Sequence, residues 1–194
     1  MKRTLLTTIC IIIFINAFAQ KTTTVKCDAI YKNKGISIKL ITFDEEKEGY
    51  DREKNSILII SQKLNGKNSI LVKDSIFSFV QKVEFQDFNN DKIKDILVQN
   101  ISDARSNWTY NLYLYNAKTN SFNKVIGFNE IKNPSYNAKY NIIESHVNSG
   151  TNWAAFYKIK NNKAYSYNIE ITDDGSSKSE KEYRQAIKKI LAKK

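Results

Sequence analysis

The sequence predicts a mostly β protein, either an antiparallel β-sandwich or a curled meander, with a helix at the C-terminal end. Apolar and polar residues alternate over many short segments, and turns that contain Asn or Gly separate these segments, as in antiparallel sheets. Near the C-terminus the apolar residues change to helical spacing: Tyr183, Ala186, Ile187, Ile190 and Leu191. We expect this helix at Glu180–Ala192, with Ser179 and Glu182 as its capping box.

The strands are predicted from β-rich segments that end at turn residues. In chain order they are Thr22–Tyr31, Ile36–Phe43, Ser56–Leu64, Asn68–Val72, Val83–Phe85, Asp95–Gln99, Trp108–Tyr115, Phe122–Ile126, Tyr140–Val147, Trp153–Lys160 and Ala164–Ile171. Asn65-Gly66 and Asn161-Asn162 indicate hairpin turns. The charged segment Asp44–Asn55 indicates a solvated loop.

Residues 1–19 have the features of a signal peptide. A basic start at Lys2-Arg3 precedes an apolar run that is too short to span a membrane, and Ala17-Phe18-Ala19 is a small-residue cleavage motif. We therefore expect cleavage near Ala19-Gln20, a periplasmic or secreted product, and no transmembrane segment in the mature chain. Residues 20–194 are expected to form a single β-rich domain.

Charge and cysteine content limit the partners and the chemistry. The formal net charge is +11, which in an exported chain favours anionic envelope polymers, lipid headgroups or an acidic protein over nucleic acid. A Lys-rich surface without any partner is the simpler alternative. Loss of Cys10 with the signal peptide leaves Cys27 alone, so no internal disulfide is expected, and an unpaired thiol is usually buried and inert.

The run Asp87–Asp95 has the spacing of an EF-hand-like calcium loop. Oxygen-bearing side chains stand at loop positions 1, 3, 5 and 9, and position 7 offers a backbone carbonyl: Asp87, Asn89, Asp91, Asp95 and Ile93. Calcium prefers six to eight such oxygens. A strand follows the loop and the position-12 glutamate is absent, so the motif is not a complete EF-hand. An Asn/Asp-rich turn without metal is the alternative.

No motif for catalysis is recognisable in the sequence, and we expect a protein that is not an enzyme. His146 is the single histidine, and neither a zinc-protease motif nor a nucleophile elbow is present. Glu130, Glu144 and Glu170 remain open as a carboxylate pair of the glycosidase type, although surface charges are the simpler interpretation.

Two polar loops are candidates for partner binding. Val147–Trp153 joins two predicted strands through small polar residues, and Ser102–Asn107 leads into Trp108 in the same way. Loops of this kind present hydrogen-bonding groups next to an aromatic residue, as binding surfaces often do. The candidate partner-binding residues are Ser149, Gly150, Asn152, Trp153, Arg105 and Trp108. The alternative is two ordinary connections whose tryptophans point into the core.

Three motifs within residues 83–168 also carry a family resemblance. They are the D-F-N-x-D-x-x-x-D loop Asp87–Asp95, the N-x-Y-x-Y strand Asn111–Tyr115, and the Ser149-Gly150 turn of the following meander. Together they resemble the periplasmic i-type lysozyme inhibitor-like and calcium-loop immunity proteins of Gram-negative bacteria. Ser149–Trp153 is similar to the S-G-x-x-Y inhibitory loop of lysozyme inhibitors, with Trp153 in place of the tyrosine.

The resemblance implies a calcium-binding protein whose Ser149 loop enters the catalytic cleft of a cell-wall hydrolase. The partner would then be a peptidoglycan-cleaving enzyme, and the calcium site would support the sheet. FG-GAP modules share the same calcium loop, so an envelope adhesion or structural module without inhibitory activity is the alternative. The absence of a sequence repeat argues against a propeller, and residues 20–82 match no known pattern.

Overall fold

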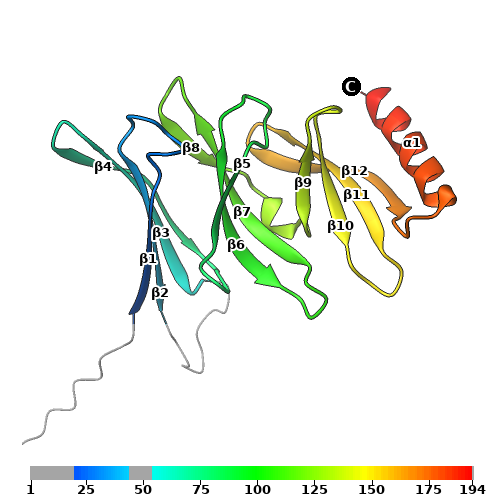
Figure 1. Ribbon diagram of the computed structural model, residues 1–194, viewed down its shortest axis with the longest axis horizontal. Helices are drawn as coiled ribbons and strands as arrows, with labels where there is room; N and C mark the ends of the chain where they lie inside the picture. The colour runs from blue at the N-terminus through cyan, green and yellow to red at the C-terminus, as the bar shows by residue number, and fades with distance from the viewer. Residues whose placement is uncertain (1–19, 44–53, 194) are drawn as a thin grey trace, which may run out of the picture.

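The computed structural model describes residues 20–43 and 54–193, so the predicted signal peptide and most of the predicted charged loop lie outside the described residues (Figure 1). The elements are β1 (Gln20–Lys26), β2 (Ile36–Phe43), β3 (Ser56–Leu64), β4 (Lys67–Ile76), β5 (Val83–Gln86), β6 (Asp95–Ser102), β7 (Trp108–Asn116), β8 (Ser121–Lys124), the 3₁₀ turn η1 (Phe128–Glu130), β9 (Pro134–Asn137), β10 (Ile142–Val147), β11 (Trp153–Lys160), β12 (Lys163–Thr172) and α1 (Ser177–Leu191).

The described strands form three four-stranded antiparallel meanders from consecutive strands: β1–β4, β5–β8 and β9–β12. The sheets follow one another across Figure 1, and α1 covers the outer side of the third. The predicted antiparallel β fold and C-terminal helix are therefore confirmed. The four-stranded unit occurs three times although the sequence has no detectable repeat.

The middle sheet is buried on both faces. Ile96 and Val98 pack toward the first sheet, whereas Leu97 and Leu112 pack toward the third. Successive side chains of a strand point to opposite faces, so a sheet between two others needs apolar residues at every position. This explains the unbroken apolar run Ile96–Val98 and places the two cores on either side of this sheet.

The third sheet packs against the apolar face of α1. The contacts join Phe156 and Tyr167 of the sheet to Ala186, Ile187 and Ile190 of the helix. This apolar layer confirms that the helical spacing read in the sequence marks a face that docks on the sheet.

The predicted capping box of the helix is wrong, because the N-cap is Ser176. Its Oγ accepts the N–H of Ser179 at 3.1 Å. Oε2 of Glu182 instead accepts the N–H of Thr172 at 3.3 Å and connects the helix to β12. Because the N-cap is Ser176 and not Ser179, the helix begins at Ser177, before the predicted start at Glu180.

Turn geometry agrees with the residues at both predicted hairpins. Asn65 and Gly66 have φ of 50° and 77°, and Asn161 and Asn162 have φ of 52° and 55°, the left-handed values of type I′ turns.

The first strand is shorter than predicted, because it ends at Lys26 and a turn follows.

Candidate functional site

The loop between β5 and β6 contains the predicted metal ligands, and its side chains turn back onto the loop backbone. Oδ1 of Asp87 accepts the N–H of Asn90 at 2.6 Å, and Oδ2 accepts that of Lys92 at 2.8 Å. Asn89 and Asp91 each accept the N–H two residues later. Asn90 and Lys92 have left-handed φ of 62° and 67°, so the loop is a compact series of Asx turns.

Asp95 connects the end of this loop to β7. It is fully buried; its Oδ2 accepts the N–H of Phe88 at 2.8 Å, and its Oδ1 accepts the N–H of Tyr115 at 2.9 Å. Burial is the main cause that raises the pKa of Asp95 to about 7, and the charges of Asp91 and Asp87 add to it against the two backbone hydrogen bonds. Asp95 thus has a structural role with or without a cation.

The donor chemistry of the loop suits calcium, since it consists of carboxylate, amide and carbonyl oxygens. Oδ2 of Asp87 and the Oδ1 atoms of Asn89 and Asp91 each accept one backbone N–H and retain a second lone pair for a cation, whereas Oδ1 of Asp87 accepts two. Among the described residues, however, no group of three or more His, Cys, Asp and Glu side chains is placed to hold one ion. Calcium binding therefore stays a prediction for Asp87, Asn89, Asp91, Ile93 and Asp95.

The two loops that the sequence suggested separately, residues 103–107 and 148–152, lie against each other and are called here the paired loops. Nδ2 of Asn107 donates to the carbonyl of Asn148 at 2.9 Å, and the N–H of Asn148 donates back to Oδ1 of Asn107 at 2.8 Å. Nδ2 of Asn148 also donates to the carbonyl of Arg105 at 3.3 Å. Asn107 is buried, so these bonds fix one loop relative to the other.

Asp103 orders the first of the paired loops from within. Its Oδ1 accepts the N–H groups of Arg105 at 2.9 Å and Asn107 at 3.0 Å, and its Oδ2 lies 3.2 Å from Nζ of Lys132. Hydrogen bonds from Asn107, chiefly from its side chain, hold the pKa of Asp103 below its usual range. The Asp103 carboxylate thus organises the centre of this loop.

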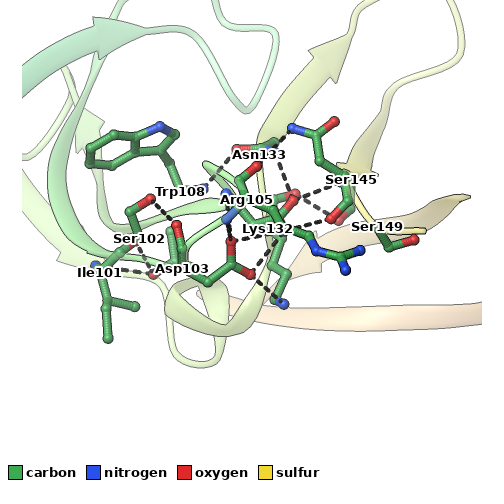
Figure 2. A network of polar contacts seen from close by, with 12 residues as sticks. Ile101, Ser102, Asp103, Arg105, Trp108, Lys132, Asn133, Ser145 and Ser149 are labelled. Carbon is green, nitrogen blue, oxygen red and sulfur yellow. Dashed lines mark hydrogen bonds and ion pairs between the residues drawn. The ribbon is translucent and has the colours of Figure 1, made fainter. Parts of the chain in front are cut away.

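Asn133 joins the paired loops to the strands behind them, as Figure 2 shows. Its Oδ1 accepts the N–H of Trp108 at 2.8 Å. Its Nδ2 donates to Oδ1 of Asn107 at 3.2 Å and to the carbonyl of His146 at 2.9 Å. Asn133 was not among the predicted site residues, although Asn before Pro134 is a turn signal that points to this segment.

The predicted partner-binding residues come together in part. Arg105, Gly150 and Asn152 are exposed, and Nη1 of Arg105 lies 4.0 Å from where a Cβ on Gly150 would stand. The hydroxyl of Ser149 donates to the carbonyl of Thr151 within its own loop. These residues form one polar surface with a positive charge.

The two tryptophans do not share this surface. Trp153 lines a cavity of about 570 Å³ between β12 and α1, whereas Trp108 begins β7 and pairs with Ser102. Both are half-buried and neither belongs to an apolar core cluster. The two aromatic residues therefore do not form one common contact site.

An apolar patch lies at the same end of the middle sheet as the first of the paired loops. Phe79, Val80 and Ile101 are 60%, 43% and 50% exposed, and the N–H of Phe79 donates to the carbonyl of Asn100 at 2.9 Å. Exposed apolar groups beside polar loops are typical of protein-binding surfaces.

Of the carboxylates left open as a catalytic pair, Glu144 in β10 lies apart from Glu130 in η1 and Glu170 in β12. Glu130 and Glu170 both act on Tyr157, whose pKa is raised first by burial and then by these charges. Glu144 lies on the face toward α1, where it accepts a hydrogen bond from Tyr183 and lies beside His146. The structure thus groups Glu144 with the single histidine, which the sequence did not indicate.

No family model, no curated protein and no solved structure matches this chain. Among the described residues, no helix is both long and apolar enough to cross a membrane.

Proposed function

We propose that the chain is an exported, calcium-stabilised binding protein that inhibits a peptidoglycan-cleaving enzyme through the paired loops. The observation that carries the proposal is the reciprocal hydrogen bonding of Asn107 and Asn148, which joins two separate loops into one surface. Ser149, Gly150 and Asn152 offer hydrogen-bonding groups, and Arg105 offers a positive charge beside them.

A surface ordered before binding supports tight association, since less conformational entropy is lost when the partner docks. Asp103 and Asn133 order the paired loops in the free protein through hydrogen bonds to backbone N–H groups and to Asn107. The apolar patch formed by Phe79, Val80 and Ile101 adds contact area. Removal of Lys2 and Arg3 with the signal peptide lowers the net charge from +11 to +9, which favours a target that is not itself strongly basic.

Hydrolysis of peptidoglycan by a panel of lysozymes and neighbouring effectors, with and without the mature protein, tests the proposal. We expect inhibition by the wild type, and a loss of at least tenfold for the Ser149→Ala, Asn152→Ala double variant and for Arg105→Ala. Lys118→Ala, in the exposed β7–β8 turn, is the matched surface control. An inactive wild type, or equal inhibition by all variants, would contradict the proposal.

The second candidate function is an envelope adhesion or structural module of the FG-GAP kind. It is supported by the three consecutive four-stranded meanders, because blade-type modules are built from the same unit. This function predicts co-sedimentation with purified cell-wall polymers and no effect on their hydrolysis, so the two assays together distinguish the candidates.

A further inference from the structure

A pocket of about 450 Å³ lies between the first and the middle sheet and is called here the intersheet pocket. Its volume is within the range of small-molecule sites. Ser75 of β4 lines it on one side, and Asn100 of β6 and Asn111 of β7 line it on the other. Among the described residues, its lining contains none from the paired loops or from Asp87–Asp95.

The side chain of Asn111 faces the intersheet pocket. Successive side chains of a strand alternate between its two faces, so Asn111 points to the same side as Tyr113 and Tyr115, which pack in the core shared with the first sheet. The hydroxyl of Tyr113 donates to Oδ2 of Asp74 in β4 at 2.6 Å, so this face of β7 lies opposite β4. The pocket that Asn111 lines together with Ser75 lies in the same space.

The carboxamide of Asn111 is buried but free. The residue is 6% exposed, and its side chain forms no hydrogen bond within residues 20–43 and 54–193. The polar side-chain atoms that are fully enclosed without a partner belong to Ser78, Gln99 and Tyr167, so Oδ1 and Nδ2 of Asn111 both retain surface that is open to the pocket. Buried side-chain amides are almost always hydrogen-bonded, and this one is therefore available to a ligand.

Asn100 adds a second amide to the same wall. Its Nδ2 donates to Oγ1 of Thr109 at 3.1 Å, and Thr109 is two residues before Asn111 in β7, so the two amides lie on one face of the sheet. Oδ1 of Asn100 accepts no hydrogen bond from the part of the chain that the structure describes. The wall thus offers two oxygen acceptors and the two N–H donors of the Asn111 amide.

The charges and the remaining lining favour a neutral ligand. Nζ of Lys124 lies 2.7 Å from Oδ2 of Asp74, so its charge is paired. Lys54 also lines the pocket, but it is exposed and its charge is screened by solvent. Phe77 is the one aromatic residue in the described lining. A planar base would stack between two apolar faces, whereas a sugar needs several amides and one ring face.

We propose that the intersheet pocket binds a neutral sugar. The Asn111 amide donates to one sugar oxygen and accepts from a neighbouring hydroxyl or amide group, and Oδ1 of Asn100 accepts from a further hydroxyl. Phe77 contacts the sugar on the side of the first sheet. Ile101 borders both this pocket and the apolar patch, so the sugar lies beside the protein-binding surface proposed above, and its binding does not depend on inhibition.

Calorimetric titration of the mature protein with glucose, galactose, mannose and N-acetylglucosamine tests this site, with glycerol and adenosine as reference ligands. We expect at least one sugar to bind at least tenfold more tightly than either reference. Asn111→Leu keeps the branched shape of the side chain but removes the amide, and it should weaken that binding at least fivefold. Asn68→Leu, the same substitution at an exposed position of β4, should leave it unchanged.

The melting temperature of the free protein gives a second readout, which a purely structural role of Asn111 would change. Without ligand, Asn111→Leu should melt at the wild-type temperature or above it, because the amide has no hydrogen bond to lose. Three results would each overturn the proposal: sugars that bind no better than glycerol or adenosine, equal affinity of Asn111→Leu and wild type, or a lower melting temperature of free Asn111→Leu.

Discussion

Nδ1 of His146 lies 3.0 Å from Oδ2 of Asp173, and this pair connects β10 to the segment that leads into α1. On the other side of the ring, Nε2 lies 3.6 Å from Oε2 of Glu144. The hydrogen bond to Glu144 and then the interaction with Asp173 raise the pKa of His146 to about 9, against partial desolvation. His146 and Asp173 line a cavity of about 350 Å³, together with Glu180 and Arg184 of α1.

This pair predicts that stability decreases with rising pH. A folded-state pKa of about 9 lies above the ordinary 6.5 of His146, so its contribution is complete below pH 6.5 and is lost between pH 6.5 and 9. The side chain is 45% exposed, and solvent screening reduces the effect to about 1 kcal/mol. The free energy of unfolding, measured with urea at several pH values in this window, should decrease less steeply with pH for His146→Asn than for wild type. Equal slopes would contradict the prediction.

Asn107→Ala should destabilise the protein by about 2–3 kcal/mol, because polar groups that lose their only partner are costly. The substitution removes a buried amide that bonds to Asp103, Asn133 and Asn148. Asn68→Ala, at an exposed position of β4, is the control and should change stability by less than about 0.5 kcal/mol. Urea unfolding measures both. A similar small change for the two variants would show that the loops are not joined as described.

Calcium should raise the melting temperature and excess chelator should lower it, because a ligand that binds only the folded state stabilises that state. Asp91→Asn should reduce the difference, since it removes a carboxylate from the loop. Magnesium at equal concentration is the control, because it requires stricter octahedral geometry. Identical melting curves with chelator and with calcium would argue against a site in Asp87–Asp95.

Gly35→Ala should destabilise the protein by about 2–4 kcal/mol, and Gly66→Ala by about 1 kcal/mol. Both glycines have positive φ, 60° and 77°, which costs a residue with a Cβ roughly 1–2 kcal/mol. A Cβ at Gly35 would also collide with the backbone carbonyl of Lys63, whereas Gly66 has open space. Thermal and urea unfolding of the two variants separate the steric cost from the conformational one. Equal losses would contradict the close approach at Gly35.

Elements with strong local patterns were predicted closely. The expected bounds of Ile36–Phe43, Ser56–Leu64 and Trp153–Lys160 match β2, β3 and β11, since strand period and turn residues are properties of neighbours in the chain. β9 was missed because the segment Pro134–Asn137 is short and has no apolar alternation. Each of the two polar loops was also recognised, because small polar residues between strands are a local signal.

The contact of the paired loops and the grouping of His146 with Asp173 have no such signal. Asn107 and Asn148 are 41 residues apart, and His146 and Asp173 are 27 apart. Asn107 and Asn148 meet because the second and third meanders stack, whereas His146 and Asp173 meet across β11 within the third sheet. Short-range residue order was therefore sufficient for most of the strands, for the two hairpin turns and for the presence of the helix. The layer order, the twice-buried middle sheet and the composition of both candidate sites came from packing between distant segments, which depends on the burial of apolar faces and not on any neighbouring residues.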